Sequence, residues 1–344
     1  MARLLEGERR ERYRASRDRL FVRGIHLLRG MLGLFGVRRA SRAGGAVGAL
    51  VGRVLGEPAA VAREQIDDVL AERSPSEREE IRRAMFRGHG SSMAEIILLD
   101  RIAADIDLWV DGEGIDVMDR ALAKGRGVIA ITGHIGNWEL LAAWFGLKGY
   151  PVSVIATPVK GEALNRENVE LRLRSGVETI ARDGPGSSKA ILRTLRGGRI
   201  LAILMDQDTH GQGVVVPFFD RPAFTPVGPA ALAWRTGAAL VGVFIHRGPD
   251  GRHRVKVVDP ELPERAGEDA AARDAWQRET TAALNRLIEA EVRTRPDEWV
   301  WWHRRWRRGS GAASGASEGQ DTASGAASGA ASGTRAPTGA EGAS

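Results

Sequence analysis

The sequence predicts an α/β domain with a mixed sheet flanked by helices, preceded by an amphipathic helical segment and followed by a low-complexity tail. Three observations lead to this prediction. Short runs of β-branched apolar residues alternate with helical stretches from residue 109 onward, the first 56 residues combine arginines with glycines and apolar residues, and the last 36 residues contain no Leu, Ile, Val or aromatic residue. We therefore divide the 344-residue chain into segments 1–56, 57–308 and 309–344.

Segment 1–56 is basic and apolar at the same time. Its arginines interrupt every apolar window of the roughly 20 residues that a membrane-spanning helix needs. No continuous apolar run is followed by a small-residue cleavage site, so a cleaved signal peptide is not expected. The pattern is typical of a helix that lies in a membrane interface with its arginines near phosphates. An ordinary helix packed on the domain would have a similar pattern.

Segment 57–308 begins with helices up to about residue 108, with helix-start residues at Ser74 and Ser76. Apolar runs of five or six residues then predict strands, and the stretches between them predict helices. The predicted strands are Val128–Thr132, Val152–Ala156, Ile200–Met205, Val214–Phe219, Leu240–Ile245 and His253–Val258. The predicted helices are Trp138–Leu147, Asn165–Ser175, Ser187–Leu195, Pro229–Thr236 and Ala270–Arg293.

The tail 309–344 is rich in Gly, Ala and Ser and cannot bury enough apolar surface to offset the entropy of ordering, so we predict that it is disordered. Its charges lower the net charge of the whole chain to +6 and leave +8 on residues 1–308. Such a charge favours nucleic acid, a membrane surface or a phosphorylated substrate. The basic residues are spread among 44 acidic ones and no nucleic-acid fold signature is present, so a nucleic-acid partner is not expected. The lack of cysteine excludes a thiol nucleophile and zinc sites built on thiolates.

The segment GHIGNWEL, which directly follows the predicted strand Val128–Thr132, carries the first candidate site. His134 and Glu139 would not share a helix face, but their side chains can meet if His134 lies in the turn and Glu139 in the first turn of the next helix. A carboxylate on one ring nitrogen raises the basicity of the other, which prepares a histidine to take a proton from a hydroxyl. The carboxyl end of a strand is also where α/β sheets build their sites.

GHIGNWEL resembles the H-x4-E/D signature of membrane acyltransferases, and the chain is most similar to the bacterial lipid A late acyltransferases (lauroyl and myristoyl transferases) and the related phosphatidylinositol-mannoside acyltransferases. Glycerol-phosphate and lysophospholipid acyltransferases usually carry Asp in place of Glu139. Further similar segments follow in the family's order over roughly residues 110 to 307. They are ENVELRLRSGVETI, MDQDTHGQGVVVPFFDRPAFTPVGPAALA and PDEWVWWHRRWRR.

The resemblance implies a glycerolipid-acyltransferase-like fold and a role for each matched residue. The His134–Glu139 dyad would activate an acceptor hydroxyl, which attacks the thioester of an acyl carrier protein. Arg172 would stabilise the charge on the thioester oxygen, with Arg174 as a second candidate. No cofactor is expected.

Asp206 and Asp208 follow a predicted strand, and the resemblance implies that they hold the site together or position the acceptor. Two close carboxylates could also bind a divalent ion, but no third ligand is near them in the sequence and we expect no metal. The implied acceptor is a phosphorylated glycolipid, a lipid A precursor, with a lysophospholipid or another glycolipid as the alternative. The implied location is the cytoplasmic face of the inner membrane, with peripheral or monotopic attachment.

Overall fold

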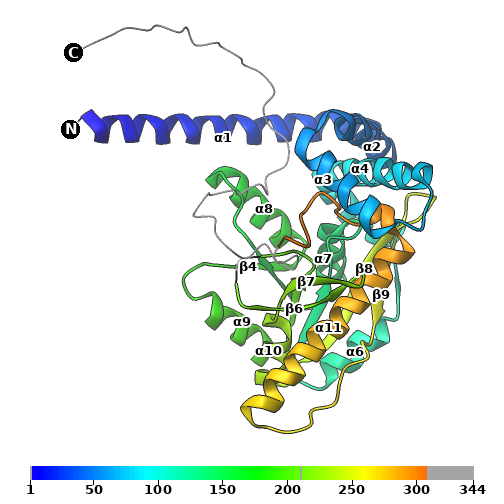
Figure 1. Ribbon diagram of the computed structural model, residues 1–344. Helices are drawn as coiled ribbons and strands as arrows, with labels where there is room; N and C mark the ends of the chain where they lie inside the picture. Colours follow the sequence, from blue (N-terminus) through cyan, green and yellow to red (C-terminus); the bar gives the residue numbers. More distant parts are fainter. Residues whose placement is uncertain (1, 210, 308–344) are drawn as a thin grey trace, which may run out of the picture. The chain divides into compact units, whose positions relative to one another are not determined.

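The computed structural model describes residues 2–209 and 211–307, with side chains from residue 16 onward. The predicted tail 309–344 lies outside the described residues. Figure 1 shows the arrangement of helices and strands.

The centre of the fold is a seven-stranded sheet with the order β1-β9-β8-β2-β5-β3-β4. Neighbouring strands are parallel except β8 and β9, which run antiparallel, so the sheet is mixed as predicted. The strands of this sheet are β1 (Val110–Glu113), β2 (Val128–Thr132), β3 (Val152–Ala156), β4 (Val177–Ala181), β5 (Ile200–Leu204), β8 (Ala239–Arg247) and β9 (His253–Val258). A separate antiparallel hairpin consists of β6 (Gly213–Phe218) and β7 (Arg221–Pro226).

Helices cover both faces of the sheet, and the central strand β2 is buried on both sides. Its residues alternate between the two apolar clusters, with Ile129 and Ile131 in one and Val128 and Ala130 in the other. The helices are α1 (Ala2–Phe35), α2 (Val37–Val54), α3 (Gly56–Val69), α4 (Pro75–Ile97), α5 (Leu99–Ala103), α6 (Ile115–Ala123), α7 (Trp138–Leu147), α8 (Glu162–Arg174), α9 (Ser187–Arg196), α10 (Gly228–Thr236) and α11 (Ala270–Thr294). Two short 3-10 helices span Ile106–Leu108 and Pro296–Glu298.

Glycines on both helices allow α2 and α4 to pack closely. A Cβ atom on Gly48 would lie 2.3 Å from the carbonyl oxygen of Phe86, and one on Gly90 would lie 2.3 Å from that of Gly44. The glycine-rich sequence of α2 is therefore required by helix packing. In the described part of the chain no single helix is long and apolar enough to cross a membrane. The pair α2 and α3 together has sufficient length and apolar composition, but the two helices meet at a bend of 89°.

The predicted start of α4 is confirmed. The Ser74 hydroxyl accepts a hydrogen bond from the Glu77 backbone N–H, and the Glu77 carboxylate accepts one from the Ser74 N–H, which is a capping box. Four elements, β1, β4, β7 and α6, are absent from the prediction. Polar residues interrupt the apolar pattern of β1 and β4, and β7 contains Pro222 and Pro226 in a hairpin outside the main sheet.

Candidate active site

His134 lies in the short loop between β2 and α7, and a C-terminal segment holds this loop in place. The Gly136 N–H donates to the Glu298 carbonyl at 2.9 Å, and the Val300 N–H donates to the His134 carbonyl at 3.2 Å. Gly136 has a φ of 59°, and a Cβ atom there would lie 2.2 Å from the carbonyl oxygen of Ile245. The loop therefore requires glycine at position 136 and the C-terminal segment beside it.

The carboxylate that contacts His134 belongs to Asp206, which follows the neighbouring strand β5. Nδ1 of His134 lies 2.8 Å from Oδ1 of Asp206, and the backbone N–H of His134 donates to Oδ2 at 2.7 Å. The indole N–H of Trp299 also donates to Oδ2, at 2.8 Å. β2 and β5 pair in parallel with Thr132 opposite Leu204. His134 and Asp206, each two positions beyond its strand, therefore lie side by side at the carboxyl edge of the sheet.

Asp206 remains ionised in this buried position. The residue is 1% exposed, and burial alone would raise its pKa. The charge of His134 and the hydrogen bonds from His134 and Trp299 outweigh burial and lower the pKa of Asp206 to about 2. A carboxylate at Nδ1 holds the ring proton there and leaves the lone pair on Nε2. Because the His134 side chain is 22% exposed, it is partly open to solvent.

The predicted hydrogen bond between Glu139 and His134 is not formed, because Glu139 binds Arg172 instead. Nε and Nη2 of Arg172 donate to the two carboxylate oxygens of Glu139 at 2.9 and 2.5 Å. Burial would lower the pKa of Arg172, but the hydrogen bonds and charge of Glu139 raise it overall. Glu139 still lies beside the loop, since its neighbour Trp138 has its ring centroid 5.1 Å from that of His134.

The other two candidates occupy different surroundings. Arg174 lies on the same helix as Arg172, but it pairs with Asp100 at 3.4 Å and is 45% exposed, so the structure does not bring it into the cluster. Asp208 is half-buried beyond Asp206, and the charges of both aspartates act on buried Arg305. Burial lowers the pKa of Arg305 to about 10 in spite of them.

Two further histidines lie near His134. The ring centroid of His303 is 6.1 Å from that of His134, and His89 lies 6.0 Å from the ring of Trp138. Burial lowers the pKa of His303 to about 4, and that of His89 to about 4, so both are neutral at pH 7. Neither of them was predicted as a site residue from the sequence, and the one signal for His303 is its place in the tryptophan-rich segment.

A buried ionic cluster supports the loop from the other side. The side chain of Asn137 caps α7 through the N–H of Leu140 at 3.1 Å and donates to Glu95 at 3.1 Å. Glu95 is 3% exposed and also accepts hydrogen bonds from Arg247 and His253. These contacts connect the start of α7 to α4, β8 and β9.

Among residues 2–209 and 211–307, no group of three or more His, Asp or Glu side chains could hold a metal ion. The site instead offers a histidine with an open ring nitrogen, a buried ionised carboxylate behind it, and an arginine fixed by a second carboxylate. This arrangement suits proton transfer from a hydroxyl together with stabilisation of a developing negative charge.

Comparison with known proteins places the chain among lipid acyltransferases. Residues 8–308 match the family model of bacterial lipid A biosynthesis acyltransferases. Phosphatidylinositol mannoside acyltransferases of Mycobacterium tuberculosis and Mycolicibacterium smegmatis are 29% and 32% identical over 58% and 55% of this chain, and the chain spans 60% and 61% of their length. The lipid A biosynthesis palmitoleoyltransferase of Escherichia coli is 25% identical over 76% of this chain and 82% of its own length.

Proposed function

Since the chain belongs to the bacterial lipid A biosynthesis acyltransferase family, we propose that it transfers a fatty acyl chain from an acyl carrier protein thioester to a hydroxyl of a lipid A precursor at the cytoplasmic face of the inner membrane. The observation that carries the proposal is the His134–Asp206 pair, which leaves Nε2 of His134 free to accept a proton. The net charge of +8 on residues 1–308 supports an acidic carrier and a phosphorylated acceptor.

In the proposed reaction, Nε2 of His134 takes the proton of the acceptor hydroxyl while the oxygen attacks the thioester carbonyl. Asp206 stays ionised and stabilises the imidazolium that forms. Collapse of the tetrahedral intermediate breaks the carbon–sulfur bond, and the imidazolium gives its proton to the leaving thiolate. The products are the acyl ester and the free carrier thiol.

Arg172 is the candidate for stabilising the oxyanion of the intermediate. Its two hydrogen bonds to Glu139 fix the guanidinium in one orientation and leave Nη1 available. The proposed role of Glu139 is therefore to position Arg172, and the direct partner of the histidine is Asp206.

A second acceptor class deserves a test because the mycobacterial relatives, at 29% and 32% identity, are named for phosphatidylinositol mannoside. Such an acceptor also presents sugar hydroxyls next to a phosphate. A lysophospholipid is the third candidate. The same pair of residues would serve all three, and only the acceptor pocket would differ.

The test is acyl transfer by the purified full-length chain from acyl-loaded carrier protein to a lipid A precursor, a phosphatidylinositol mannoside and a lysophospholipid, with the products identified by mass spectrometry. We expect transfer to the lipid A precursor, and loss of transfer in His134→Ala. Arg172→Ala should lower kcat by about 10²–10³, whereas Arg174→Ala, on the same helix, should stay close to the unaltered protein. Activity in folded His134→Ala, or equal losses in the two arginine variants, would overturn the proposal.

A further inference from the structure

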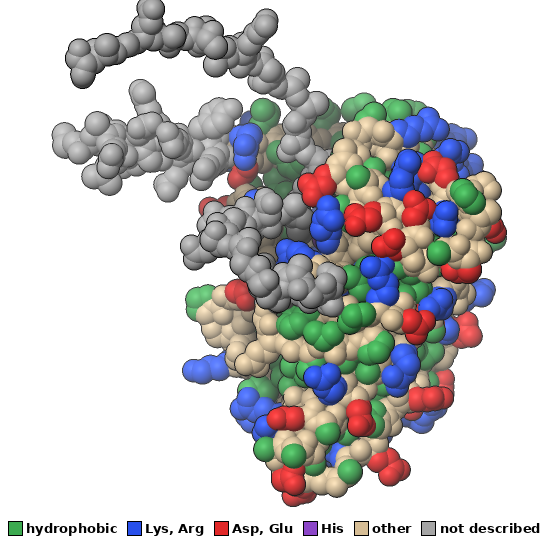
Figure 2. Space-filling view, in the orientation of Figure 1, with side chains coloured by type: hydrophobic (Ala, Val, Ile, Leu, Met, Phe, Trp, Pro, Cys, Tyr) green, Lys and Arg blue, Asp and Glu red, His purple; other side chains and the backbone are tan. Residues whose placement is uncertain are grey.

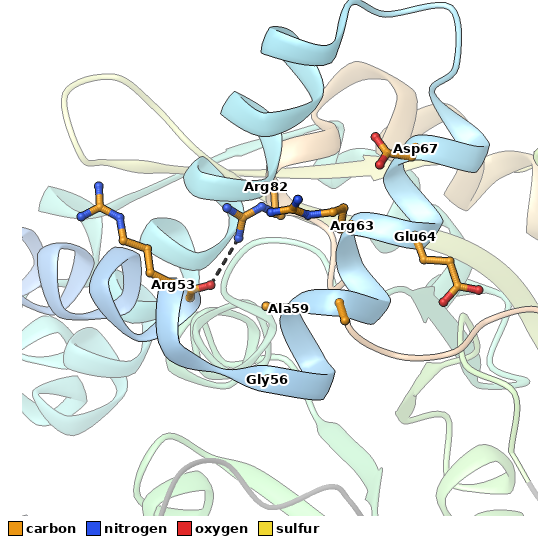
Figure 3. A pocket seen from close by; sticks show the side chains of 9 residues that line it. Arg53, Gly56, Ala59, Arg63, Glu64, Asp67 and Arg82 are labelled. Carbon is orange, nitrogen blue, oxygen red and sulfur yellow. Dashed lines mark hydrogen bonds between the residues drawn. The ribbon is translucent and has the colours of Figure 1, made fainter.

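A hollow of about 600 Å³ lies at the bend between α2 and α3, outside the candidate active site. Figure 3 shows arginines from three helices around it, Arg53 from α2, Arg63 from α3 and Arg82 from α4. Small residues at the bend, among them Gly56 and Ala59, leave room for a ligand. A Cβ atom on Gly56 would meet no atom within 4 Å, so the hollow is open there.

The acidic side chains at the hollow already have partners. Glu64 pairs with Arg304 at 3.5 Å, and Asp67 pairs with Arg78 at 3.0 Å. Arg82 is likewise compensated, because its guanidinium binds Glu79 at 2.6 and 2.8 Å. It is further fixed by a hydrogen bond of 3.2 Å to the carbonyl of Gly52, drawn as a dashed line in Figure 3.

Arg53 and Arg63 remain as uncompensated charges. Within the described ranges, no carboxylate forms an ion pair with either of them, and both are exposed. Arg53 and Arg63 therefore contribute two positive charges at the hollow that no ion pair of the described residues offsets. An anion with several oxygens, such as a phosphate, is the ligand that two guanidinium groups bind best.

Exposed apolar side chains gather on α1 and α2, and one of them, Val54, adjoins Arg53 at the basic hollow. Ten of the fourteen large apolar side chains that are exposed in the described structure lie on α1 and α2. They are Leu20, Phe21, Leu27, Leu28, Met31, Leu34, Phe35, Val47, Leu50 and Val54. Such a concentration is typical of an interaction surface. In Figure 2, hydrophobic and basic side chains lie next to each other over α2.

The apolar residues of each helix share one face. On α2 the spacing of Val47, Leu50 and Val54 places them on one side, and Val54, which is 75% exposed, adjoins Arg53. On α1 the side opposite the apolar residues faces the rest of the protein, since Arg29 pairs with Asp100 of α5 at 2.6 Å. Apolar side chains next to arginines are the combination by which helices lie in a lipid interface.

We propose that the hollow at the α2–α3 bend binds the headgroup phosphate of an anionic membrane lipid through Arg53 and Arg63, while the apolar faces of α1 and α2 enter the acyl layer. This inference rests on the membrane-surface part of the proposed function and adds a lipid site separate from the catalytic one. The occupant is a lipid in a bilayer, because a soluble phosphate would leave Val54 and the exposed apolar faces of α1 and α2 in water.

The test is co-sedimentation of the full-length chain with vesicles of phosphatidylcholine, alone or mixed with phosphatidylglycerol. Each basic side chain near an anionic surface contributes about fivefold to binding, so R53Q/R63Q should lower the partition coefficient on the mixed vesicles by roughly 30-fold. The matched control R193Q/R196Q removes two exposed charges from α9 and should change it by less than about twofold, because distant charges are screened. R53K/R63K keeps the charges and should retain most of the binding.

Equal losses in the two glutamine variants would overturn the proposal, since net charge alone would then explain binding. The proposal would also fail if inorganic phosphate stabilised the unaltered chain but not R53Q/R63Q while both bound vesicles equally, which would indicate a soluble anion. His134→Ala should bind vesicles like the unaltered chain. Failure of the catalytic proposal would therefore leave this assay unaffected.

Discussion

Replacement of Asp206 by Asn tests which carboxylate serves His134. One oxygen of Asp206 accepts two hydrogen bonds, from the His134 N–H and from Trp299, and the other faces Nδ1 of the ring. An Asn side chain keeps the first two bonds if its oxygen takes that side, and its NH₂ group then points at Nδ1. The ring must place its proton on Nε2, and the nitrogen that faces the acceptor hydroxyl loses its lone pair.

The expected loss follows from this change of tautomer. We expect kcat to fall by about 10⁴, with little change in KM, because the loss concerns proton transfer and leaves acceptor binding intact. Glu139→Gln is the matched variant. It weakens the hold on Arg172 without reaching the histidine ring, so kcat should fall by about 10² or less and the tautomer should not change.

The assay combines transfer kinetics with ¹⁵N NMR of the His134 ring, which distinguishes a proton on Nδ1 from one on Nε2. Thermal unfolding of each variant verifies that the protein is folded. The reasoning is refuted if folded Asp206→Asn keeps more than a tenth of the rate, or if Glu139→Gln moves the ring proton to Nε2 and Asp206→Asn does not.

Three further predictions concern stability. Burial would lower the pKa of His246, but hydrogen bonds to Glu291 and Glu298 raise it to about 9. The contribution of His246 to the free energy of unfolding should therefore be complete below pH 6.5 and disappear as the pH rises through 9. Denaturant unfolding should show that the free energy of unfolding declines across this pH range, and that the decline is absent in His246→Gln. Glu95→Gln removes the buried carboxylate that Arg247 and His253 bind and should cost about 3 kcal/mol in the free energy of unfolding, and a cost below 1 kcal/mol would contradict the role of the cluster. Gly136→Ala should lower both the melting temperature and kcat, because the residue has a φ of 59° and no room for a Cβ atom, and a variant with unaltered kcat would contradict the tight loop.

Much of the fold follows from local sequence patterns. The predicted strands Val128–Thr132, Val152–Ala156 and His253–Val258 have the observed bounds. Val128–Thr132 is a continuous apolar run, as a strand buried on both faces requires, whereas in His253–Val258 buried and more exposed residues alternate. The strand order could not be predicted in this way. β5 pairs with β2 and separates it from β3, although β3 is the next strand along the chain, and this order depends on how the connecting helices pack.

Local sequence patterns also do not show which residue contacts His134. The predicted contact was with Glu139, and the structure has Asp206 there. His134, Glu139 and Asp206 were selected from their motifs, but the pairing was inferred from the spacing of His134 and Glu139 in one short segment. The actual contact joins residues 72 positions apart, and it follows from the parallel register of β2 and β5 once the two strands are known to be neighbours. An H-x4-E spacing therefore identifies the loop that carries the histidine and the start of the next helix. It does not identify the carboxylate that orients the ring, because a residue in the first turn of α7 can equally face α8, where Arg172 offers a bidentate partner.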